Sequence, residues 1–266
     1  MNKSELLEKY SKPEEKLLVS KLLDKIELCN KRNVITTTDF LDLYQKNIVE
    51  KVLKTVECNF IFFGGYSEAT RVMLIIYPKK LTIQMVEENY KNYMEIVRIE
   101  LPKSNIGEYR HKDYLSGIMK LGIKREKFGD ILVENYGADI IVSKDISKYI
   151  QSNLLGLTRF SKSKIEIVDI SNIKKVEMKK EEIKIIVPSL RLDSVVAQLS
   201  NTSRTKANEI ILDSRVFINY EEQKRTDKQI KEKDIIVIRG KGKFEIDKVE
   251  GNTRKNKQIL IVKKYV

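Results

Sequence analysis

The spacing of apolar residues changes along this 266-residue chain, and this change most restricts the folds that it can adopt. In residues 18–26 and again in 44–52, large apolar side chains recur every four positions, which predicts two helices that each bury one face. Thr38 or Asp39 is the expected N-cap of the second helix, because its side-chain oxygen can accept an unpaired backbone N–H.

The pattern then becomes that of strands. Aromatic and β-branched runs cover residues 59–63 and 72–77, and Gly64-Gly65 between them favours a turn. We therefore expect two paired strands, the second of which ends at Pro78.

Strand and helix signals are mixed in the next stretch. We expect a strand at 94–101, a helix at 111–121 that Gly122 stops, a hairpin around Asn135-Tyr136-Gly137, and a helix at 146–155. Such a mixture predicts the α+β class.

The chain is strongly basic. It holds 51 Lys and Arg against 38 Asp and Glu, a formal charge of +13, which attracts polyanions such as nucleic acids. The 79 residues from Pro188 onward carry 18 basic and 11 acidic residues, so charge density is highest at the C-terminus. The charged stretch Lys174 to Lys184, with few apolar residues, is the best candidate for a domain boundary.

Several functional classes lack any signal. The two cysteines show no CxxC spacing, His111 is the only histidine, and no GxxxxGK[ST] or GxGxxG loop occurs. We therefore expect no metal, no cofactor and no small-molecule substrate. No apolar run approaches the length of a membrane span, and residues 1–16 lack the apolar core of a secretory signal, so we expect a cytoplasmic protein.

The C-terminal part contains a candidate phosphate site. Two short helices are expected at 190–199 and 203–211, and the second has Arg204 and Lys206 in its first turn. Cations there oppose the helix dipole, by roughly 0.3 to 1 kcal/mol, unless an anion neutralises them. A strand at 234–238 then leads into a glycine-rich basic turn that a phosphate can approach closely.

These motifs occur in a known order. The pattern is Arg191-Leu192-Asp193, then Ser203-Arg204 with Ala207 and Ile211, then Arg215-Val216 with Ile218-Asn219, then Asp234 with Arg239-Gly240 and Gly242. It resembles the small RNA-binding module named after ribosomal protein S-four, over about residues 188–244. Ser214 stands where that module usually has glycine, so a positive φ there would be strained.

A second resemblance covers the remainder of the chain. It is carried by Phe63-Gly64-Gly65-Tyr66 with Ala69 and Arg71, by His111-Lys112-Asp113-Tyr114-Leu115, and by the run from Leu121 to Ile131. These motifs are similar to the YlmH family of Gram-positive bacteria. Thr70 replaces an acidic residue, and Ser116 separates Leu115 from Gly117 where family members usually run Leu-Gly directly.

The resemblance implies a non-enzymatic, ribosome-associated protein. It implies a helical N-terminal region with a β-hairpin (1–80), an RRM-like middle domain (81–183) and a small module of two helices on a short antiparallel sheet (184–266). Ribosomal RNA, tRNA and the large ribosomal subunit are the implied partners, in quality control of stalled subunits. Family relatives are also linked to cell division. No K/R-G-F/Y-G/A-F-V-x-F/Y string occurs, so base stacking by the middle domain has no support.

The resemblance maps RNA contact onto Arg191 and Arg204. Asp193 is expected to orient Arg191 or to cap structure rather than to act on a substrate, and we predict no catalytic residue. The complete predicted RNA-binding set is Arg191, Ser203, Arg204, Lys206, Arg215, Asn219, Arg239, Lys241 and Lys243, with Arg110, Lys112, Lys124 and Arg125 in the middle domain.

Two alternatives stay open. Pseudouridine synthases also carry this module and an Arg-Leu-Asp triplet, but their catalytic Asp lies in a large domain after the module, whereas 22 residues follow Phe244 here. A cell-division adaptor that acts through protein contacts is the other alternative.

Overall fold

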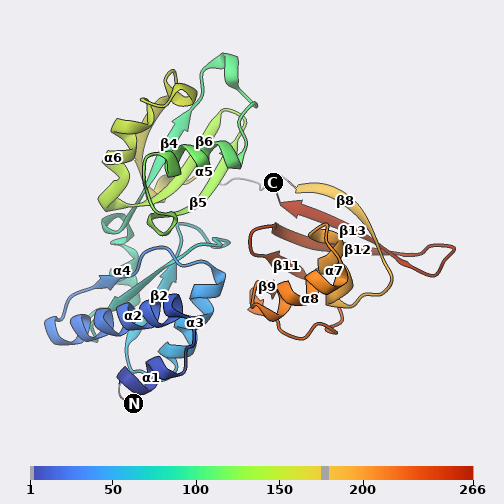
Figure 1. Ribbon diagram of the computed structural model, residues 1–266. Coiled ribbons are helices and arrows are strands. Elements are labelled where there is room, and N and C mark those ends of the chain that lie inside the picture. Colours follow the sequence, from blue (N-terminus) through green and yellow to red (C-terminus); the bar gives the residue numbers. More distant parts are fainter. Residues whose placement is uncertain (1–2, 175–179, 266) are drawn as a thin grey trace. The chain divides into compact units, whose positions relative to one another are not determined.

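The computed structural model describes residues 3–174 and 180–265, which divide into two compact units, Met1–Val176 and Glu177–Val266 (Figure 1). The division falls within the charged stretch predicted as a boundary, of which residues 175–179 lie outside the described residues. A further domain limit at residue 80 stays a prediction, because both parts of that sequence belong to the first unit.

The first unit begins with a helical layer on a small sheet. Strands β1, β3 and β2 pair antiparallel in that order, and α2 and α3 pack on them through a shared apolar core. The two predicted helices and the predicted strand pair are thus confirmed. The elements are α1 (Lys3–Glu8), α2 (Pro13–Arg32), β1 (Thr36–Thr37), α3 (Leu43–Leu53), β2 (Asn59–Phe63) and β3 (Met73–Tyr77).

The predicted N-cap of α3 was wrong. Asp42 caps this helix, since its carboxylate accepts from the backbone N–H of Gln45 at 2.9 Å and the Gln45 side chain accepts from the N–H of Asp42 at 3.0 Å. Thr38 instead bonds Leu74 through both its backbone N–H and its hydroxyl oxygen. The segment before Asp42 is extended along β3, so the helix cannot begin earlier.

The second half of this unit has the connectivity expected of an RRM-like domain. Its strands and helices alternate as βαββαβ, and the antiparallel sheet has the order β5-β6-β4-β7. Helices α5 and α6 cover one face (Figure 1), where Tyr114, Ile118 and Ile150 are buried. The elements are α4 (Ile83–Glu87), β4 (Met94–Glu100), α5 (His111–Lys120), β5 (Phe128–Glu134), β6 (Gly137–Ser143), α6 (Lys144–Leu154) and β7 (Lys164–Asp169).

The opposite face of this sheet is occupied by the N-terminal part of the same unit. Phe40 and Met73 pack there against Met94, Ile96 and Ile141 in one buried cluster. A side chain on Gly129 in β5 would meet the Phe40 ring, because an added Cβ would lie 2.8 Å from it. An RRM stacks bases on this face of its sheet. In this unit the apolar half of that face is covered by the N-terminal elements.

The sheet of the second unit has more strands than expected. We predicted a short sheet, but its antiparallel sheet has six strands in the order β10-β9-β11-β12-β13-β8, with α7 and α8 packed on its apolar side. The additional strands are β8, which begins inside the charged stretch, and the long pair β12 and β13. The elements are β8 (Lys180–Val187), α7 (Leu192–Leu199), α8 (Arg204–Leu212), β9 (Val216–Ile218), β10 (Glu221–Glu222), β11 (Ile235–Ile238), β12 (Gly242–Asn252) and β13 (Gln258–Tyr265).

The backbone confirms the expected strain between α8 and β9. Ser214 has φ of 58°, in the left-handed region that glycine tolerates best. Among the described residues, no helix is both long and apolar enough to cross a bilayer.

Candidate nucleic-acid interface

Two arginines lie side by side where α7 and α8 begin. Arg191 immediately precedes α7 and Arg204 is the first residue of α8, and both bond the carboxylate of Asp193. The distances are 2.9 Å from Nη2 of Arg191 and 2.8 Å from Nη2 of Arg204 to Oδ2. The side chain of Asp193 is 2% exposed, whereas those of Arg191 and Arg204 are 36% and 52% exposed.

The carboxylate of Asp193 remains ionised in this environment. Burial alone would raise its pKa, but the hydrogen bonds from the two guanidinium groups outweigh that effect and lower the pKa to about 2. The expectation that Asp193 orients Arg191 is confirmed, and the same carboxylate also holds Arg204. The result is a pair of fixed, solvent-facing guanidinium groups.

The first turn of α8 adds polar groups beside this pair. Ser203 is the N-cap, and its hydroxyl accepts from the backbone N–H of Lys206 at 3.2 Å. The Lys206 ammonium bonds Glu209 at 2.6 Å on an exposed surface. Exposed pairs of this kind contribute little to stability, so a phosphate can compete for the ammonium.

The predicted residues after α8 have different surroundings. Arg215 donates to the backbone oxygen of Arg239 at 3.1 Å, which joins β9 to the turn after β11. Asn219 has φ of 50° and bonds both Asp234 and the N–H of Ile235, so its side chain holds a turn. Lys241 is exposed in the tight turn between Gly240 and Gly242.

Lys243 is buried at 8% exposure. Its ammonium lies 4.4 Å from the ring centre of Tyr265 and 5.3 Å from that of Tyr220. Two cation–π contacts therefore satisfy this lysine within the protein, and its contact with RNA stays a prediction.

Of the four predicted RNA-binding residues in the middle domain, three are exposed and one bonds within the fold. Arg110, Lys112 and Lys124 are exposed, with no ion pair to any residue in the described ranges. Arg125 points into the fold, where its Nη1 donates to the backbone oxygens of Phe128 and Gly129 at 2.6 and 3.0 Å. Burial and the charge of Arg71 lower its pKa to about 10, and its contact with phosphate stays a prediction.

A polar network that the sequence did not predict joins the two halves of the first unit. The buried carboxylate of Asp130, on β5, accepts from the Tyr66 hydroxyl at 2.9 Å and from the N–H and hydroxyl of Thr70 at 2.7 Å each. Arg71 donates to backbone oxygens of Phe40, Arg125 and Phe128. The one sequence signal for this network is a lone carboxylate, that of Asp130, between apolar strand residues. The Thr70 hydroxyl supplies a donor that an acidic side chain would lack.

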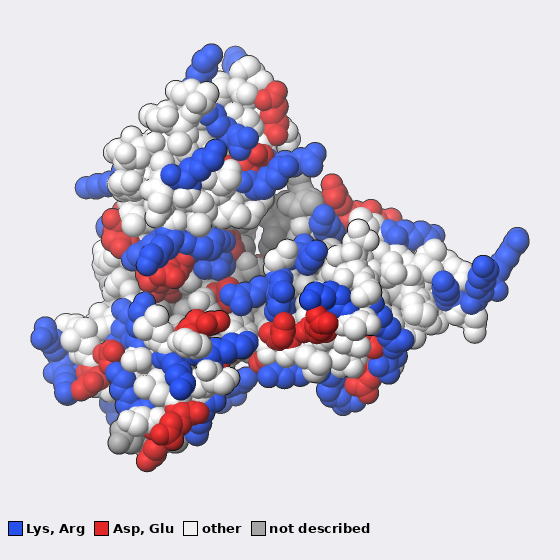
Figure 2. All heavy atoms as spheres, in the orientation of Figure 1, with Lys and Arg blue, Asp and Glu red and all other residues white. Residues whose placement is uncertain are grey.

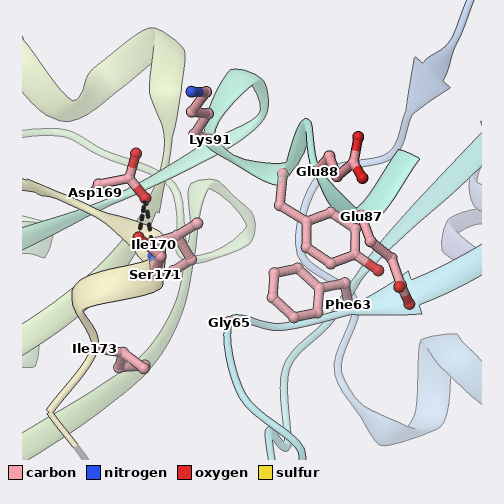
Figure 3. Close-up of a pocket in the computed structure, with 10 residues that line it drawn as sticks. Phe63, Gly65, Glu87, Glu88, Lys91, Asp169, Ile170, Ser171 and Ile173 are labelled. Carbon is pink, nitrogen blue, oxygen red and sulfur yellow. Dashed lines mark hydrogen bonds between the residues drawn. The ribbon is translucent and has the colours of Figure 1, made fainter. Parts of the chain in front are cut away.

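A pocket of about 410 Å³ lies in the first unit beside Phe63 and Tyr90, whose rings stack 3.7 Å apart (Figure 3). Its wall also carries the carboxylates of Glu87, Glu88 and Asp169, against one lysine, Lys91. Asp169 accepts from the N–H and hydroxyl of Ser171, which lowers its pKa and keeps it charged. Such a lining repels phosphate, so this pocket is no candidate for the RNA backbone.

Within the described ranges, no cluster of three or more His, Cys, Asp or Glu side chains is arranged to hold a metal ion.

Two family models match the chain in succession. One is described as "YlmH, N-terminal" and matches residues 14–81, and the other as "Putative RNA-binding domain in YlmH" and matches residues 86–185. The chain belongs to the YlmH family. Most of the first unit is thus of YlmH type, and the second match ends within β8.

Two relatives extend this finding. The "Ribosome-associated protein quality control protein P2" of Bacillus subtilis (strain 168) is 28% identical over 250 residues, which cover 93% of this chain and 94% of the relative. A solved structure named "Cell division protein ylmH from Streptococcus pneumoniae" superposes with a TM-score of 0.50 at 17% identity, over 63% of this chain and 98% of that one. At that identity, the structural likeness shows a shared fold alone.

Proposed function

We propose that this YlmH-family protein is a non-enzymatic RNA-binding protein of the ribosome. It contacts ribosomal RNA and tRNA through the second unit and acts in quality control of stalled large subunits, in the cytoplasm. The observation that carries the proposal is the pair Arg191 and Arg204, fixed by Asp193 with exposed guanidinium groups. The name of the Bacillus subtilis relative supports the ribosomal setting.

The arginine pair suits phosphate recognition for a physical reason. A guanidinium group matches two phosphate oxygens with parallel N–H donors, and its affinity improves when the side chain is already held in position. Asp193 supplies that position, because its oxygens accept from Nε and Nη2 of Arg191 and from Nη2 of Arg204. The remaining N–H groups can donate to an RNA backbone.

The first unit offers a weaker surface for RNA. The apolar half of its sheet face is buried against Phe40 and Met73, and the charged groups that line the pocket beside Tyr90 are three carboxylates and one ammonium. Farther along the same face, Arg98 makes two bonds of 2.7 Å to buried Asp139. Exposed Arg110, Lys112 and Lys124 stay candidates for additional phosphate contacts.

The position of Asp193 argues against a pseudouridine synthase. A catalytic carboxylate must reach its substrate, whereas this one is almost fully buried and bonded to two arginines. The cell-division alternative is supported by the name of the Streptococcus pneumoniae protein. That name describes the relative and not this chain.

Sedimentation through a sucrose gradient tests the proposal. The purified protein is mixed with large ribosomal subunits from Bacillus subtilis, and the wild type is compared with an Arg191→Ala, Arg204→Ala double variant. A Lys21→Ala, Arg32→Ala variant is the control, because it removes the same charge from exposed positions on α2.

We expect the wild type and the control to travel with the subunits and the double variant to stay at the top of the gradient. If the wild type also stays at the top, ribosome binding is wrong and the adaptor role gains support. If all three proteins travel alike, the arginine pair is not the contact.

A further inference from the structure

The second unit carries a long hairpin that reaches beyond its core. Strands β12 and β13 pair from Phe244–Lys264 to Asn252–Gln258, with register shifts after Ile246 and Val249 that increase the twist. In Figure 1 the hairpin tip projects away from α7 and α8. From residue 251 to residue 257 no side chain is buried, so this part adds nothing to the apolar core.

The charges of the hairpin are distributed unevenly along its length. Its three acidic residues all bond lysines near the base and middle: Glu245 bonds Lys180 at 2.8 Å, Asp247 bonds Lys233 and Lys263 at 2.6 and 2.9 Å, and Glu250 bonds Lys184 at 2.7 Å. The tip carries Arg254, Lys255 and Lys257 and no acidic residue from 251 to 257. Within the described part of the chain these three cations have no ion-pair partner. Figure 2 shows basic side chains at the projecting end of the hairpin.

The tip has a defined conformation. The N–H of Asn256 donates to the oxygen of Thr253 at 2.9 Å, which closes a four-residue turn with Arg254 and Lys255 at its centre. Lys257 donates from its N–H to the Thr253 hydroxyl at 3.1 Å, and Asn252 bonds Asn256 across the hairpin at 3.0 Å. The backbone therefore holds three exposed cations at one end of a narrow ribbon.

We propose that this tip, formed by Arg254, Lys255 and Lys257, is a second RNA-contacting element, which binds the phosphates of folded RNA away from the arginine pair at α7 and α8. The inference rests on the proposed function and adds a separate contact to it. Basic side chains on a two-stranded ribbon can follow a phosphate backbone, and such contacts carry no sequence preference. The tip would thus lengthen the RNA footprint and steepen its salt dependence.

Titration of fluorescein-labelled bulk tRNA with the full-length chain tests this inference. Dissociation constants are measured by anisotropy at several KCl concentrations for four proteins. These are the wild type, the tip variant Arg254→Ala, Lys255→Ala, Lys257→Ala, the Arg191→Ala, Arg204→Ala variant, and a control, Lys16→Ala, Lys21→Ala, Arg32→Ala. The control removes one arginine and two lysines from exposed positions on α2. Circular dichroism melting confirms that each variant folds.

We expect the tip variant to weaken binding by about tenfold at 0.1 M salt and to reduce the log–log salt slope by about 2, while the control keeps the wild-type slope. A tip variant with wild-type affinity and slope overturns the inference but leaves the proposed function standing, provided that the Arg191→Ala, Arg204→Ala variant is weakened. A wild type that does not bind tRNA counts against both. Tip-dependent binding to vesicles of phosphatidylglycerol, with unchanged tRNA affinity, would assign the tip to a lipid surface and also overturn the inference.

Discussion

At the residue scale, Asp193 determines how the candidate interface is built. It contributes a negative charge directly beneath a surface proposed to bind a polyanion, which long-range electrostatics alone would disfavour. The arrangement makes sense if the carboxylate orients the two guanidinium groups more effectively than its charge repels phosphate. Orientation and net charge therefore predict opposite effects when this carboxylate is neutralised.

We expect Asp193→Asn to weaken tRNA binding by about tenfold, although it raises the net charge by one, because a neutral amide cannot accept from both guanidinium groups as strongly. Asp213→Asn, at an exposed position that ends α8, is the matched control. It should leave the affinity equal to or slightly above that of the wild type. Tighter binding by both variants would show that net charge, not orientation, governs the interface.

The same carboxylate predicts a pH dependence of stability. Its pKa is about 2 in the folded protein and ordinarily near 4, so its stabilising effect is complete above pH ~4 and is lost as the pH falls through about 2. The expected loss in the free energy of unfolding is about 2 kcal/mol. Urea unfolding at several pH values measures this free energy. NMR of fluorotyrosine at Tyr220 and Tyr265 monitors the unfolding in the second unit. An Asp193→Asn variant with the same decrease between pH 4 and 2 would contradict the assignment.

At the element scale, the turn between α8 and β9 stores strain in Ser214. Its positive φ requires a conformation that costs a non-glycine residue roughly 1 kcal/mol, whereas glycine adopts it freely. Ser214→Gly should therefore raise the midpoint of thermal unfolding of this unit by a few degrees and leave tRNA affinity unchanged. A lower midpoint would mean that the buried serine side chain contributes more than the strain costs.

The elements that sequence predicted well are those with regular periodicity and clear stop signals. Helix α5 ends where Gly122 takes φ of 78°, and the β5–β6 hairpin turns at Asn135-Tyr136 as expected. Strand β8 was missed because its charged residues resemble a linker, and only Ile183, Ile185 and Val187 face inward. The β12–β13 pair was missed because irregular register breaks its alternation.

The candidate site was predictable only in part. The module motif indicated Arg191 and Arg204 because they belong to one local pattern, and the structure brings them to one carboxylate. The contacts of Asp130 join residues 60 or more positions apart, and no local pattern encodes them. The same limit applies to Lys243, whose two aromatic neighbours come from other strands and turns.

At the scale of the whole molecule, the formal charge of +13 is divided between two units. In the first unit, the sheet that gives the RRM-like connectivity is covered on one face by helices and on part of the other by the N-terminal elements. In the second unit, helices cover one side of the sheet, and basic groups remain exposed at the start of α7 and α8 and at the hairpin tip. The second unit is therefore better suited than the first to bind a polyanion.

The most direct test of this account is the salt dependence of binding to Bacillus subtilis large subunits, measured for the wild type and the Arg191→Ala, Arg204→Ala variant. Each phosphate contact contributes about 0.7 to 0.9 to the slope of log affinity against log salt concentration. We expect a steep, linear decrease for the wild type and, for the variant, a slope that is shallower by about 1.5. Affinity that does not change with salt, or equal slopes for the two proteins, would contradict the claim that this arginine pair binds ribosomal RNA through its phosphates.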